Sequence, residues 1–179
     1  MLHNTKMFFF IERHWYSLRA FKTYIRPLLE YNSPVWSPHL LKDIDLLENV
    51  QRRFTKRLRG MYNLSYNERL LKLNIERLEA RRLRTDTITT YKIIFGLIKC
   101  TNFFKFLDNA IETRGHMYKL LKLNCNCDVR KYCFSCRAVN LWNNLPAETT
   151  NFTSILAFKN SLNYSHFDKL CIGNSIYWF

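Results

Sequence analysis

The chain has 179 residues, 47% of them hydrophobic and 16% aromatic, a composition that supports a buried core and argues against intrinsic disorder. Lys and Arg number 28 against 14 Asp and Glu, and this formal net charge of +14 favours a polyanionic partner. No run approaches the roughly 20 apolar residues that span a bilayer, and the apolar run at residues 7–11 is too short for a signal peptide. We therefore expect an intracellular protein, nuclear or cytoplasmic, with no membrane partner and reduced cysteines.

Apolar residues spaced by three and four predict helices at residues 16–31, 38–59 and 78–98. Pro27 should kink the first helix. Residues 32–38 are predicted to be a turn, because the residue before each Pro favours an extended backbone. In the second helix the predicted apolar stripe is Leu40, Leu41, Ile44, Leu47, Val50, Phe54 and Leu58. Ser65 and Glu68 form a capping box that opens a short helix ending near Asn74.

The second half of the chain has a looser pattern, with an aromatic segment at residues 103–107 and a turn at 113–115. Residues 118–123 are expected to form a short extended segment, and residues 129–145 and 154–162 to form helices. The fold class is therefore all-α or nearly so, with a short β segment as the exception. We expect three regions: an N-terminal segment at 1–14, a thumb-like helical bundle at 15–100 and a helical tail at 101–179.

The positive charge is concentrated in residues 51–84, which hold eleven basic residues and three acidic ones. One cluster lies in the late turns of the helix at 38–59, where cations complement the helix dipole: Arg52, Arg53, Lys56, Arg57 and Arg59. A second lies in the early turns of the helix at 78–98, where cations oppose the dipole: Arg81, Arg82 and Arg84. Phosphates of a nucleic acid would offset that cost. The alternative for both clusters is a solvated charged face.

No complete catalytic site is evident. Metal-assisted phosphoryl transfer needs converging carboxylates, and the chain has no adjacent Asp pair. Asp43 and Asp45 are two residues apart at the start of a helix, so their side chains diverge by about 200° around its axis. No Gly-rich phosphate loop occurs, and no Ser, Cys or Lys stands in an activating setting. We expect no catalytic residue and no cofactor.

A zinc site is conceivable at Cys125, Cys127, Cys133 and Cys136, with His116 as a substitute ligand. However, the two cysteine pairs are only five residues apart, and the second pair falls inside a predicted helix. Buried or incidental thiols are therefore the favoured interpretation, and no metal is expected.

A series of short sequence words occurs in one order along the chain. They are RAFKTYIRPLLEY (19–31), PVWSPH (34–39), DID (43–45), ENVQRRFTK (48–56), LSY (64–66), EARRLR (79–84), YKI (91–93), TRGH (113–116), DVR (128–130), NLWNNLP (140–146) and FKNSL (158–162). In this order the chain resembles LINE-type, jockey-like non-LTR retrotransposon reverse transcriptases, in the region downstream of the polymerase palm. The resemblance covers residues 17–168.

The resemblance implies that the chain is the thumb and carboxy-terminal part of an RNA-directed DNA polymerase. Its basic clusters would contact phosphates of the template-primer, an RNA–DNA hybrid or duplex. The catalytic aspartates would belong to a palm preceding residue 1, so we expect a fragment without polymerase activity whose natural neighbour is that palm. Two alternatives stay open: a transposon relic without function, and a co-opted protein-interaction module that docks a partner on residues 103–107. A complete enzyme is disfavoured.

Overall fold

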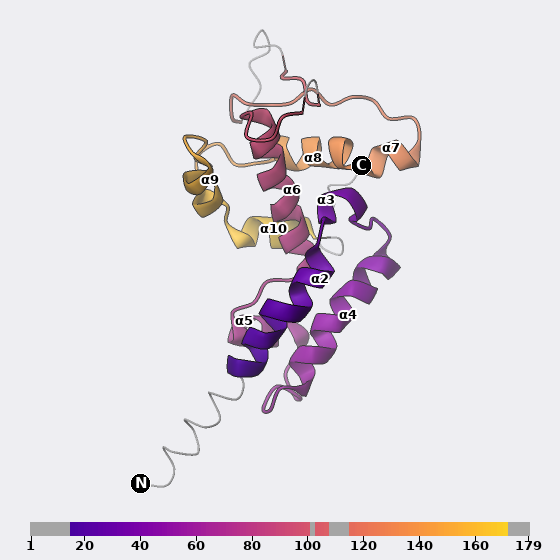
Figure 1. The fold of residues 1–179 in the computed structure, drawn as a ribbon, viewed down its shortest axis with the longest axis vertical. Helices are drawn as coiled ribbons and strands as arrows, with labels where there is room; N and C mark the ends of the chain where they lie inside the picture. The colour runs from indigo at the N-terminus through magenta and orange to yellow at the C-terminus, as the bar shows by residue number, and fades with distance from the viewer. Residues whose placement is uncertain (1–14, 101–102, 108–114, 172–179) are drawn as a thin grey trace. The chain divides into compact units, whose positions relative to one another are not determined.

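The structure is a computed structural model that describes residues 15–100, 103–107 and 115–171. The chain divides into two compact units (Figure 1). The first unit comprises described residues 15–32 and 40–78, and the second comprises residues 33–39 and those from 79 onward. Across the described residues the secondary structure is helical, apart from one antiparallel β-bridge between Phe106 and Leu120. The predicted all-α fold is confirmed, and one end of the bridge, Leu120, falls inside the segment expected to be extended, whereas Phe106 lies in the aromatic segment at 103–107. The predicted division into three regions stays a prediction.

The first unit begins with a helical run at residues 15–20, followed by a π-helical turn η1 (Phe21–Ile25) and α2 (Arg26–Glu30). Arg26 N–H donates to the Phe21 carbonyl, the five-residue spacing of a π-turn. Pro27 lies in the first turn of α2, where its missing N–H is tolerated. The distortion expected from Pro27 is therefore present as a π-turn directly before it.

The first unit continues with α4 (Leu41–Arg57) and α5 (Tyr66–Leu73). Phe21 stacks on Phe54 of α4, with ring centroids 4.3 Å apart. The capping box at Ser65 and Glu68 is present, and Asn74 ends α5 in the left-handed conformation with φ of 47°, as predicted.

The buried face of α4 differs from the predicted apolar stripe. Leu40, Leu41 and Val50 are exposed, whereas Glu48, Gln51 and Thr55 are buried. The reason is a set of polar partners that a helical pattern does not reveal. The Glu48 carboxylate accepts hydrogen bonds from the Tyr66 hydroxyl and from Leu78 N–H. The Gln51 amide donates to the Tyr66 hydroxyl at 3.0 Å and to the Glu76 carbonyl at 2.9 Å.

The second unit contains α3 (Ser33–Trp36), nearly all of α6 (Leu78–Ile94), α7 (Asp128–Tyr132), α8 (Phe134–Asn143), α9 (Ile155–Ser161) and α10 (Tyr164–Leu170). Its core gathers apolar side chains of α6, α8, α9 and α10 around the fully buried Trp142 and Phe158. Tyr91 of α6 stacks on Phe158 with ring centroids 4.5 Å apart. Stacked and edge-on aromatic pairs thus join helices that are distant in the sequence.

Three predicted boundaries in the second unit are wrong. Ser33 precedes a Pro yet is helical in α3, where an extended turn was expected. The helix predicted at 129–145 is broken at Cys133, whose ψ of 158° is extended. The helix predicted to reach residue 98 ends at Ile94, because Gly96 takes a positive φ of 71°. The patterns gave no sign of α10, and residues 1–14 and 172–179 lie outside the described chain.

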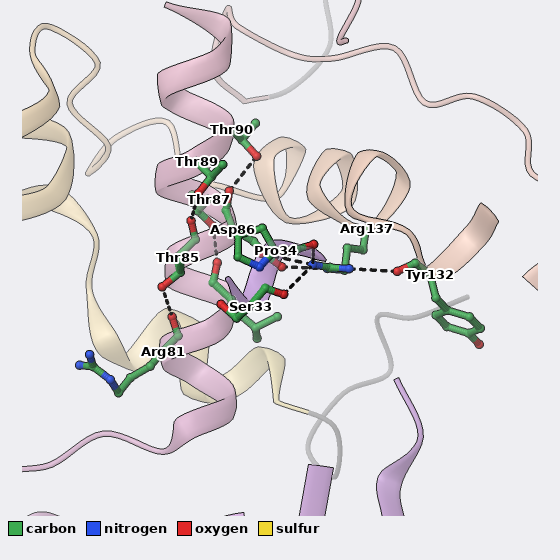
Figure 2. A network of polar contacts seen from close by, with 11 residues as sticks. Ser33, Pro34, Arg81, Thr85, Asp86, Thr87, Thr89, Thr90, Tyr132 and Arg137 are labelled. Carbon is green, nitrogen blue, oxygen red and sulfur yellow. Dashed lines mark hydrogen bonds and ion pairs between the residues drawn. The ribbon is translucent and has the colours of Figure 1, made fainter. Parts of the chain in front are cut away.

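A buried ion pair joins α6 to α8 (Figure 2). Arg137 Nε donates to Asp86 Oδ2 at 2.8 Å, and Arg137 Nη2 donates to the Pro34 carbonyl at 2.5 Å. Arg137 Nη1 donates to the Tyr132 carbonyl at 3.1 Å. Burial raises the pKa of the Asp86 carboxyl, although the Arg137 hydrogen bonds and the charges of Arg137 and Arg82 act in the opposite direction. One guanidinium therefore connects α3, α6 and α7 to α8.

Within the described ranges, no helix has both the length and the apolar character needed to cross a membrane.

Arg137→Ala should lower the free energy of unfolding by about 3 kcal/mol, because it leaves the Asp86 carboxylate buried without its partner. Urea denaturation measures this, with the exposed Arg53→Ala as a control that should change stability by less than about 0.5 kcal/mol. The deficit of Arg137→Ala should shrink as the pH falls through the raised pKa of Asp86, since a neutral carboxyl costs less to bury. Equal stability of the two variants at neutral pH would contradict the role given to this pair.

Candidate nucleic-acid interface

The carboxyl end of α4 and the turn after it form a hollow of about 380 Å³, here called the α4 hollow. Its lining contains four cationic side chains and no acidic one: Arg53, Lys56, Arg57 and Arg59, together with Leu58, Gly60 and Tyr62. All four cations are exposed. Four of the five basic residues predicted for this helix therefore gather around one concave surface of the first unit.

The local backbone explains why these cations converge. Leu58 and Met61 are buried and hold the chain against the first unit as it leaves α4. Gly60 between them takes a positive φ of 76°, which turns the chain sharply, and a side chain there would be strained. Tyr62 follows the turn, and the Lys56 ammonium lies 4.9 Å from the centroid of its ring. Cations of the last helical turn and of the following turn thus border the same hollow.

Arg53 and Arg57 are the side chains of this hollow best placed to bind a ligand. Within the described chain, neither guanidinium has a hydrogen bond, an ion pair or a ring contact. A guanidinium offers five N–H donors in a fork that matches a phosphate. Two exposed guanidinium groups at one concave surface suit an external anion.

Arg52 differs from Arg53 and Arg57 because other residues of the first unit supply partners for its guanidinium. Its guanidinium donates to Asn49 at 2.7 Å, lies 3.6 Å from Asp45 and sits 5.1 Å from the ring centroid of Tyr66. Arg52 therefore stabilises the packing of α4 against α5, and its predicted phosphate contact stays a prediction.

The second predicted cluster is not an open cationic face. Arg82 is only 2% exposed, so the prediction that it lies on the surface of α6 is wrong. Arg84 donates to the Lys159 carbonyl at 3.1 Å, and Arg81 is half-buried. The physical reason is that α6 also buries polar positions, among them Asp86 and Thr90, so its buried face is wider than its apolar stripe.

The structure does not gather the four candidate zinc ligands. Cys125 Sγ lies 2.9 Å from Cys136 Sγ. The Cys133 thiol also lies beside Cys136 and contacts Ser135 Oγ at 3.0 Å, whereas Cys127 is exposed. His116 is buried elsewhere, with Nε2 2.8 Å from the Trp142 carbonyl. Among the described residues no three His, Cys, Asp or Glu side chains are arranged to hold a metal ion.

Asp43 and Asp45 have different surroundings and do not form a carboxylate pair. Asp45 is exposed and pairs with Arg52, while Asp43 is half-buried in the first turn of α4, where a negative charge favours the helix dipole.

Comparisons of the chain with protein-family models, with curated proteins and with solved structures find no match.

The thiol of Cys136 should be alkylated by iodoacetamide at pH 8 about tenfold more slowly than the exposed Cys100 thiol. Burial, with the Cys125 and Cys133 thiols beside it, raises the pKa of Cys136 to about 12, and the thiolate is the reactive form. Mass spectrometry of the alkylated peptides measures both rates. Cys125→Ser should accelerate Cys136, and urea should abolish the difference. Equal rates for Cys136 and Cys100 in the folded protein would contradict this placement.

Proposed function

We propose that the chain binds double-stranded nucleic acid, an RNA–DNA hybrid or a duplex, through phosphate contacts at the α4 hollow. The observation that carries the proposal is the convergence of four exposed cations without a carboxylate among the lining residues. Phosphate oxygens would satisfy the guanidinium groups of Arg53 and Arg57, and displaced counterions would contribute entropy to binding. Contacts of this kind position a protein on the backbone and read no sequence.

The dipole of α4 does not by itself explain where the four cations of the α4 hollow lie. Cations in the last turn of a helix are stabilised by typically 0.3–1 kcal/mol each, and Lys56 and Arg57 benefit in this way. Arg59 lies beyond the end of α4, so the dipole of that helix gives it little. A dipole also does not require a concave arrangement. An anion bound in the hollow would account for the position of Arg59 and for the concave arrangement of the four cations.

The resemblance to the region downstream of a retrotransposon palm supports the same ligand. In this proposal the first unit serves as a thumb that grips the template-primer, and polymerase activity of its own is not part of the proposal. The natural neighbour would be the palm. An apolar face on η1 and α2 supports a polypeptide neighbour: Tyr24, Leu28 and Tyr31, spaced by four and three residues, are 73%, 78% and 79% exposed.

Arg53→Glu with Arg57→Glu should weaken binding of a blunt RNA–DNA hybrid at least about tenfold and reduce the slope of log K against log salt by about 2. Lys42→Glu with Lys72→Glu is the matched control, because these exposed lysines of the first unit lie outside the hollow and the charge change is the same. Fluorescence anisotropy over a salt series measures both quantities. Circular dichroism checks the fold. Equal losses in the two variants would show that net charge, not the α4 hollow, determines binding.

A further inference from the structure

The second unit contains its own hollow, of about 290 Å³, between residues 103–105, residues 121–125 and helices α7 and α8. We call it the α8 pocket. Like the α4 hollow, it is lined by four cations and by no carboxylate: Lys105, Lys122, Arg130 and Lys131. The proposed hybrid binding does not use this pocket.

Backbone pairing fixes the two chain segments that form one wall of the α8 pocket. The antiparallel bridge places Phe106 opposite Leu120. On either side of it, Leu121 N–H donates to the Lys105 carbonyl at 2.8 Å, and Leu107 N–H donates to the Lys119 carbonyl at 2.9 Å. Lys105 and Lys122 are therefore carried by segments that are hydrogen-bonded to each other.

Helix α8 anchors this wall. The Asn143 side chain donates to the Leu120 carbonyl at 2.8 Å and accepts from Leu120 N–H at 2.9 Å, so it acts as one more peptide group beside the bridge. The Trp142 indole N–H donates to the Tyr118 carbonyl at 2.6 Å. The same helix supplies Cys136 and Asn140 to the pocket lining. Hydrogen bonds from α8 therefore fix the position of this wall of the pocket.

The lining combines three kinds of group that one class of ligand needs together. Phe103 is an aromatic wall that is 42% exposed, although its ring contacts Phe104 and Phe134. The side chains of Asn124 and Asn140 supply amide donors and acceptors. The four cations supply positive charge. An unpaired nucleotide presents a π-face, polar base edges and phosphates, and proteins bind single strands by stacking on aromatic side chains within a cationic groove.

We propose that the α8 pocket binds one unpaired nucleotide of a single-stranded RNA or DNA segment. Phe103 stacks on the base, the two asparagines contact its edge, and Lys122 and Arg130 contact the flanking phosphates. This inference rests on the proposed function in that the ligand is again nucleic acid. It differs in the form of nucleic acid that is bound, because the α4 hollow binds paired strands and the α8 pocket binds an unpaired base.

Lys122→Glu with Arg130→Glu, in the full chain, should weaken binding of a short single-stranded oligonucleotide about tenfold and leave binding of a blunt hybrid within about twofold. Lys99→Glu with Lys169→Glu is the control, since both lysines are exposed in the second unit and neither lines the pocket. Phe103→Ala should also weaken the single strand about tenfold. The charge variant keeps the test valid if the loss of Phe103 disturbs the fold.

A second readout reports occupancy directly. Cys125 lines the α8 pocket and is half-exposed, so saturating single-stranded oligonucleotide should slow its alkylation by a maleimide at least about fivefold. Alkylation of the exposed Cys100 should stay unchanged. Mass spectrometry measures both thiols in the same sample.

The inference is overturned if the Lys122 and Arg130 variant, correctly folded, binds the single strand like the control, or if Cys125 is not protected. Loss of hybrid binding equal to the loss of single-strand binding also overturns it, because the pocket would then add only general charge. Failure of the α4 hollow is distinguishable. In that case Arg53→Glu with Arg57→Glu leaves hybrid binding unchanged, while the single-strand results stand or fall separately.

Discussion

The second unit depends on the ion pair between Asp86 and Arg137. A buried charge without a partner costs several kcal/mol, so this guanidinium and carboxylate must meet wherever the unit is folded. The same guanidinium donates to carbonyls of Pro34 and Tyr132, which ties α3 and the end of α7 to the start of α8 (Figure 2). Because α8 also anchors the segment around Leu120, the geometry of the α8 pocket follows from where this pair sets the helix.

Polar groups are buried in both units, and burial divides the arginines of this basic chain into two groups. Arg69 and Arg82 are buried, and Arg69 donates to the Arg52 carbonyl. Arg53 and Arg57 are exposed at the end of α4. The net charge of +14 therefore overstates the surface that a polyanion can meet. A smaller number of converging cations is the better guide to binding.

The two hollows are alike in charge and different in shape and chemistry. The α4 hollow is an open surface of arginines and one lysine, which suits the regular phosphates of a duplex. The α8 pocket adds an exposed aromatic ring and two amides, which suit an unpaired base. A template-primer presents both kinds of ligand, a paired region and an unpaired strand. Each unit would thus contribute a different contact to the proposed function.

The sequence by itself determined what local forces decide. Apolar spacing placed most helices, the capping box at Ser65 fixed the start of α5, and Asn74 marked its end, because each of these depends on neighbouring residues. The cations of the α4 hollow were found for the same reason, because they follow one another closely in the sequence. Only the tertiary structure decided that Glu48 and Arg82 are buried and that residues 103–105 meet α8. Those outcomes depend on partners far along the chain, and no local pattern records them.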